Sequence, residues 1–206
     1  RYVSKLRLEK MLDHEYQLLE ERLDRENYKD TRFFTFADTV ATINYSKTLK
    51  GHGWIGLRFQ RIPNERPSDF ILHVKLNDQD AKLQQETVGI IGTNLLHACF
   101  SESDPKIILK RLYDNLSKDQ FEINMVEVVG PAFENIDNRL LSLTLVKERM
   151  TNAVIFTPDG VNQQPANILY KKNILTMRGS FRPVTKVNID MLEKGLASFK
   201  ENKKVE

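Results

Sequence analysis

The sequence predicts an α/β or α+β fold: a mixed sheet flanked by helices, with an amphipathic helix at the N-terminus. Three observations lead to this class. An apolar stripe with helical spacing opens the chain, adjoining strand-like runs follow it, and strand-like and helix-like segments then alternate. The composition agrees with the class, because 40% hydrophobic and 29% charged residues in a chain of 206 are ordinary for a globular protein that buries a sizeable core.

The first expected element is a helix over residues 4–27. Its apolar side chains recur at steps of three and four residues, so they lie on one stripe: Leu8, Leu12, Tyr16, Leu19 and Leu23. An apolar stripe of this length needs a cover, which is either the rest of the domain or another chain. We therefore treat residues 1–28 as a segment of their own, and a homo-oligomer contact along the stripe is one of the two expected covers.

The remaining residues, 29–206, are expected to form a single mixed domain. Strands are expected at 31–46, 54–61, 69–76, 121–129, 152–156 (buried on both faces) and 173–179. Helices are expected at 81–100, 105–116, 137–150 and 188–201, with Asp80, Asp104 and Asn188 as N-caps. The chain starts with Arg1 in the middle of a helical pattern, so we expect a fragment of a longer protein.

The stretch "LKGHGWIGLRF" suggests a ligand site, because it combines glycine, histidine, tryptophan and arginine. We interpret the first residues as a glycine turn around His52. In an antiparallel hairpin of 54–61 with 69–76, aligned apolar faces require pairs whose numbers sum to an odd value, and 131 suits the loop. The face opposite the core would then be a cationic shelf of four residues: Trp54, Arg58 (opposite His73), His73 and Lys75. The alternative is an ordinary solvated outer face.

Asp38 is the candidate carboxylate of the preceding strand. Alternation places it on the same face as Phe34, Phe36 and Val40, where bulky apolar groups point. An unpaired charge in such surroundings is costly. Asp38 is therefore either a member of a structural ion pair or a carboxyl with a raised pKa, suited to proton transfer.

The second candidate site is "TMRGSFRPVTK". Extended backbone would project Arg178, Ser180 and Arg182 to one side, and Pro183 favours that path for the residue before it. Two guanidiniums beside a hydroxyl form a clamp for phosphate or carboxylate, and Lys186 follows near a helix N-terminus that also favours anions. In the alternative, these arginines pair with acidic side chains of the same chain.

Four stretches together, "RFFTFADTVA", "GHGWIGLRFQ", "GPAFENIDNRL" and "RGSFRPVTKVNIDML", resemble a family of longer bacterial proteins of unassigned function. The likeness covers most of residues 1–200 and implies a bacterial, cytoplasmic origin and a larger parent chain. Members are often labelled nicotinate-nucleotide adenylyltransferase. An enzyme of that fold carries H-x-G-H after its first strand, whereas this chain has "GHGW", so no catalytic residue carries over.

Several functional classes lack support in the sequence. The net charge of +3 is too weak and too dispersed for a nucleic-acid partner, and the apolar stretches are too short to cross a membrane. One cysteine, Cys99, is typical of a reducing compartment, and the four histidines lack the spacing of metal ligands. No cofactor is assigned.

Two functional hypotheses remain. In the first, the domain binds a small nucleotide-like or phosphorylated anion. His52, His73 and Asp38 would supply proton chemistry, while Trp54, Arg58, Arg178, Ser180, Arg182 and Lys186 would hold the ligand. In the second, the domain is a non-catalytic regulatory or assembly module.

Overall fold

A computed structural model describes residues 2–203 of the chain. It divides into two compact units at Pro165 and Ala166, and each is described by itself below. The N-terminal helix belongs to the first unit together with the sheet, so the division does not fall at residue 28. The predicted class, a sheet flanked by helices with an N-terminal helix, is confirmed.

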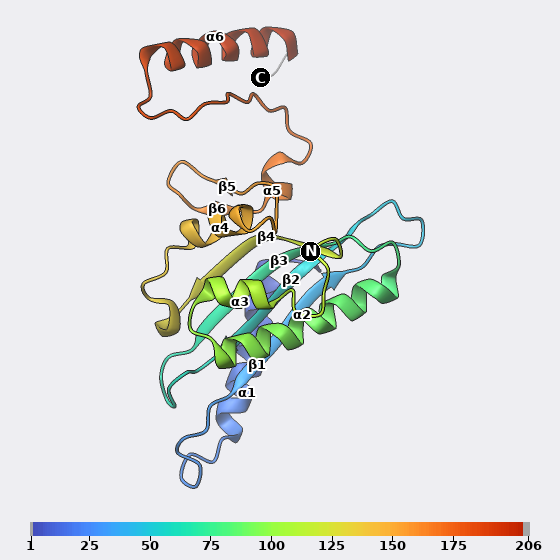
Figure 1. The fold of residues 1–206 in the computed structure, drawn as a ribbon, viewed down its shortest axis with the longest axis vertical. Coiled ribbons are helices and arrows are strands. Elements are labelled where there is room, and N and C mark those ends of the chain that lie inside the picture. Colours follow the sequence, from blue (N-terminus) through green and yellow to red (C-terminus); the bar gives the residue numbers. More distant parts are fainter. Residues whose placement is uncertain (1, 204–206) are drawn as a thin grey trace. The chain divides into compact units, whose positions relative to one another are not determined.

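The first unit is built on a four-stranded sheet in the order β1-β2-β3-β4 (Figure 1). Its strands are β1 (Phe34–Ala41), β2 (Gly51–Phe59), β3 (Ser68–Leu76) and β4 (Phe121–Val129). All three pairings are antiparallel, so the sheet is not mixed in strand direction and the α+β alternative applies. Sequential order leaves β1 and β4 as the two edges.

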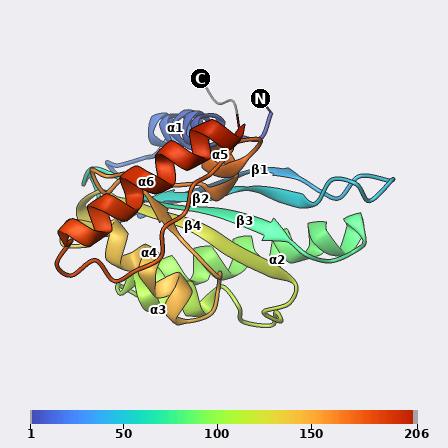
Figure 2. The same ribbon diagram turned by 90° about the horizontal axis from the view of Figure 1, so that it is seen from above.

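Helices cover both faces of this sheet (Figure 2). On one face lie α2 (Ala81–Ser101), α3 (Pro105–Arg111) and α4 (Asn138–Lys147), which enclose the larger core. On the other face lies α1 (Lys5–Arg22), whose Leu8 and Leu12 are fully buried in a second, smaller cluster. Burial of each such side chain stabilises the fold by roughly 1.5–3 kcal/mol. Leu8, Leu12 and Tyr16 of the apolar stripe are thus buried within the chain itself, whereas Leu19 and Leu23 stay partly exposed.

The pairing of β2 with β3 has the expected facing but a different register. Trp54 lies opposite His73, and Arg58 lies opposite Asp69 rather than His73. The reason is that β2 already ends at Phe59, opposite Ser68, so the connecting loop is 60–67 instead of 62–68 and the paired numbers sum to 127 instead of 131. The paired numbers still sum to an odd value, and Arg58 therefore remains on the same face as His73.

Aspartates begin three helices of the first unit. Asp80, Asp104 and Asp137 each accept a hydrogen bond from a backbone N–H in the first turn of the following helix. The first two caps were predicted.

The expected strand at 152–156 is reduced to β5 (Ile155–Phe156), which pairs with β6 (Asn162–Gln163) in a separate small sheet and is only half-buried. A short 3-10 turn, η1 (Pro131–Phe133), follows β4.

The second unit contains α6 (Lys186–Lys203), while α5 (Pro165–Leu169) begins at the boundary. Residues 173–179 are irregular in the structure, so the strand expected there is not formed. The N-cap of α6 is Thr185, not Asn188. Thr185 and Asn188 bond reciprocally, each side chain accepting from the other's backbone N–H, and this capping arrangement starts the helix earlier.

Candidate functional site

The Gly-His-Gly-Trp stretch is part of strand β2 and does not form the expected turn. The glycines of β2 lie at positions where a Cβ would clash with neighbouring residues. A Cβ on Gly56, two residues further on, would lie 2.8 Å from a methyl of Leu12 and 2.9 Å from one of Leu8, so the missing side chain lets α1 approach the sheet. Trp54 is 5% exposed in the cluster beneath α1. It is therefore a core residue in this structure and is not presented to a ligand.

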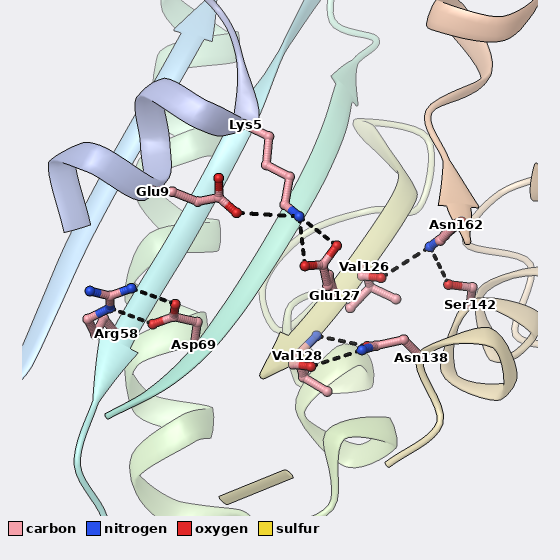
Figure 3. A network of polar contacts seen from close by, with 10 residues as sticks. All are labelled: Lys5, Glu9, Arg58, Asp69, Val126, Glu127, Val128, Asn138, Ser142 and Asn162. Atoms are coloured by element: carbon pink, nitrogen blue, oxygen red, sulfur yellow. Dashed lines mark hydrogen bonds and ion pairs between the residues drawn. The ribbon is translucent and has the colours of Figure 1, made fainter. Parts of the chain in front are cut away.

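Arg58 is held by two carboxylates of the same unit. Its Nε and Nη2 donate to the two oxygens of Asp69 at 2.7 and 2.9 Å, and Nη1 donates to Asp13 of α1 at 2.7 Å (Figure 3 shows the Asp69 pair). The Asp69 hydrogen bonds raise the pKa of the guanidinium further. The structure thus uses this cation to join α1 to the β2–β3 hairpin.

The two candidate histidines, His52 and His73, lie side by side next to Trp54, on the face of the sheet that α1 covers. His52 Nδ1 lies 3.4 Å from His73 Nε2, and the edge of the Trp54 ring contacts the His73 ring. His73 Nδ1 lies 2.6 Å from Asn124 Oδ1, and its Nε2 lies 2.8 Å from Gln164 Nε2. Burial lowers the pKa of His73 to about 4, so it is a neutral ring near pH 7 that donates from Nδ1 and accepts at Nε2.

A β-bulge positions Asn124. The β3–β4 register shifts between His73 and Val74, which leaves Asn124 as the extra residue of β4 and turns both Asn124 and Met125 toward the α1 face. The sequence reasoning missed this residue. The signal was present in "FEINMVEVV", where polar residues at 122 and 124 are followed by the next one at 127, a break in the period of two.

Lys75 also forms an ion pair within the chain. Its ammonium contacts Glu122 at 3.2 Å, and the hydroxyl of Thr151 donates to the same carboxylate. Lys5 of α1 likewise pairs with Glu127 at 2.7 Å (Figure 3). The predicted cationic shelf therefore exists as a set of ion pairs, in which the charge of each cation is largely compensated.

Asp38 lies apart from the histidines, on the other face of the sheet. Together with Phe36 and Val40 of β1 it lines a groove of about 610 Å³ whose opposite wall is α2. Among the described side chains, no hydrogen bond or ion pair reaches its carboxylate, and half-burial raises its pKa. Of the two hypotheses for Asp38, the structural ion pair therefore lacks a partner among the described residues, and the raised pKa agrees with the other.

A second groove, of about 480 Å³, lies between α1 and β1. Met11, Glu15 and Leu19 of α1 form one wall, and Phe36 and Asp38 of β1 belong to both grooves. The β1 edge therefore runs between two hollows, one on each face of the sheet.

The opposite edge of the sheet is closed. The side chain of Asn138 accepts from the Val128 N–H at 2.8 Å and donates to its carbonyl at 2.9 Å, in the manner of a neighbouring strand (Figure 3). Asn162 donates to the Val126 carbonyl, and the Ile123 N–H donates to the Met150 carbonyl. No comparable contact reaches the outer edge of β1 from the residues that the structure describes.

The predicted clamp residues Arg178, Ser180 and Arg182 lie in the irregular part of the second unit, and Lys186 is the first residue of α6. Phe181 has a φ of +48°, in the left-handed region. The backbone therefore does not continue as extended strand from Arg178 to Arg182, and the shared projection expected for them is lost. All four side chains are exposed.

No protein-family model, curated protein or solved structure matches the chain. The resemblance to a bacterial family therefore stays a prediction. Among residues 2–203, no cluster of three or more His, Cys, Asp or Glu side chains is arranged to hold a metal ion. No helix in that range has the length and hydrophobicity needed to span a membrane.

Proposed function

We propose that this chain is an interaction module that binds an extended segment of a partner protein along the outer edge of β1. This proposal keeps the non-catalytic assembly hypothesis, but it places the contact surface on the edge of the sheet instead of on the N-terminal helix. The observation that carries it is the difference between the two sheet edges: β4 is closed by Asn138, Asn162 and the Met150 carbonyl, while β1 has grooves on both faces and no outer partner in the described residues.

The physical basis is strand addition. An edge strand presents unpaired N–H and C=O groups, and an added strand satisfies them without any change in the sheet. Side chains of the added strand alternate between the two faces and would enter the two grooves, which supply specificity. A free edge flanked by hollows thus offers both backbone affinity and side-chain selection.

The alternative function, binding of a small anion, has weaker support on the α1 face. Arg58, Lys75 and Lys5 all have carboxylate partners there. The remaining anion candidates are Arg178 and Arg182 of the second unit, whose test is described with the predictions below.

Photo-cross-linking tests the proposal in the cells that produce the full-length protein. A benzophenone amino acid replaces Phe36 in one variant and Asp38 in another, and Tyr45, fully exposed in the β1–β2 connection, serves as the control position. Strand addition predicts that positions 36 and 38 cross-link to residues about two apart in one segment of one partner. Unrelated segments, or the same products from position 45, would contradict it.

A further inference from the structure

We infer the chemistry of the segment that β1 takes up: apolar side chains on both faces, with a lysine or arginine at two neighbouring positions, one for Asp38 and one for Glu15. This inference rests on the proposed docking function and adds the class of partner. It follows from the charges of the two grooves and from the alternation of side chains along a strand.

Each groove is largely apolar and carries acidic charge only. The groove against α2 is lined by Phe36, Val40, Val88 and Leu96, with Asp38 as its charged residue. The groove against α1 has a similar apolar lining, and its charged residues are Glu15 and Asp38. Among the residues that the structure describes, no lysine or arginine lines either groove. An incoming segment is therefore selected for apolar bulk and for positive charge.

The Asp38 carboxylate is the stronger of the two determinants. It is half-buried beside Phe36 and Val40, and among the described side chains it has no hydrogen-bond or ion-pair partner. A carboxylate partly removed from water without a partner destabilises the fold. A cation on the bound segment would supply the missing partner.

The positions of the two carboxylates fit one strand. Asp38 projects from β1 on the α2 side, whereas Glu15 belongs to α1 on the opposite face. Neighbouring residues of an added strand point to opposite faces. Two consecutive basic residues would therefore reach one carboxylate each.

The same charges disfavour a second copy of β1 as the occupant. Antiparallel pairing of β1 with its own copy would bring the acidic grooves of the two copies, with their Asp38 and Glu15 carboxylates, close together. Like charges brought together in a partly desolvated site repel. The structure thus favours a heterologous basic segment over β1-to-β1 dimerisation.

Three synthetic ten-residue peptides of alternating valine and leucine test this chemistry. They differ only at two adjacent central positions, which hold two lysines, two glutamines or two glutamates. Binding to the full chain, measured by fluorescence anisotropy, is expected to be strongest for the lysine peptide and weakest for the glutamate peptide, with about fivefold lost per ion pair removed. A lysine peptide N-methylated along one edge should lose binding.

Substitutions assign the effect to the groove. Asp38→Asn is expected to weaken lysine-peptide binding by about fivefold while raising the melting temperature of the free protein, because it removes an unpartnered half-buried charge. Glu15→Gln should also weaken binding. The matched control is Asp119→Asn, an exposed aspartate outside both groove linings, which should change neither quantity.

The possible outcomes separate the inference from the function beneath it. Equal binding of the three peptides, all sensitive to N-methylation, would overturn the charge selection and leave strand addition in place. Binding that is insensitive to N-methylation, or no binding by any peptide, would overturn strand addition at β1 and the inference with it. Tighter binding of the glutamate peptide would overturn the charge assignment directly.

Discussion

The two edges of the sheet differ in how their backbone groups are satisfied. At β4, the side chain of Asn138 pairs with both backbone groups of Val128, and Asn162 and Met150 bond to further positions. At β1, the flanking helices cover the faces beside the strand and leave grooves next to its edge. Proteins usually blunt both edges of a sheet. Among the described residues, β1 is the edge of the sheet left open, and the proposed strand addition rests on this difference.

The difference arises from chain order. β4 is followed by η1, α4, β5 and β6, and this part of the chain returns to the edge of β4 with Asn138 and Asn162. β1 is preceded by α1, whose Leu8 and Leu12 pack against Gly56, so the helix lies close to the middle of the sheet. A helix seated over the middle of a face closes that face but not the edge beside it.

Hydrogen exchange tests this comparison with the largest expected effect. The amides of Val128 and Ile123, bonded to Asn138 and Met150, should exchange slowly. Along β1, only every second amide pairs with β2, so protection should alternate, and the outward amides should exchange on the order of 100-fold faster or more. Uniform protection along β1, measured by NMR, would show that its edge is covered in solution.

Asn138→Ala should open the closed edge. It leaves the N–H and C=O of Val128 without protein partners, and each half-buried group left unpaired costs about 1–3 kcal/mol. We expect a matching fall in the free energy of unfolding by chemical denaturation, together with faster exchange of the Val128 amide. Asn152→Ala, at an exposed position, is the control and should change neither.

The burial of His73 predicts a pH dependence of the free energy of unfolding. Its folded pKa of about 4 lies below the unfolded value of 6.5, so the unfolded chain binds the proton first as the pH falls. Stability is therefore full above about pH 6.5 and is lost between that pH and 4, by about 3 kcal/mol in total. His73→Gln should flatten this part of the stability–pH curve, whereas His97→Gln, at an exposed histidine, should not.

The local rules of the sequence predicted much of the fold. Period-two alternation placed β2, β3 and β4 within a few residues, and aspartate caps placed the starts of α2 and α3. The odd-sum rule assigned the faces of the hairpin correctly. Its register failed because the facing depends only on the parity of the sum, while the register depends on where each strand ends.

The candidate site was harder to predict, because it depends on contacts between distant segments. Composition marked Arg58 and Trp54 as unusual, but their partners, Asp13, Asp69 and the underside of α1, are set by tertiary packing. The grooves of β1 are likewise a property of which helix covers which face. For Asp38 alone, the structure agrees with the reason for which the sequence marked it: it is a charged residue placed among apolar neighbours.

The smallest expected effect on fold stability concerns the arginines of the second unit. Arg178 and Arg182 are exposed in irregular chain, and no carboxylate among the described side chains pairs with either. Changing either one to alanine should therefore leave the melting temperature nearly unchanged, in contrast to Asn138→Ala.

If Arg178 and Arg182 form an anion clamp, both changes should remove the thermal stabilisation given by nucleotides or sugar phosphates, since a charge-assisted contact contributes about 1.5–3 kcal/mol of binding. Lys172→Ala, at an exposed lysine of the same irregular segment, is the matched control and should keep that stabilisation. Lowered melting temperatures in both arginine variants, with no anion effect on the wild type, would instead assign them to internal ion pairs and leave the β1 edge as the binding surface of the chain.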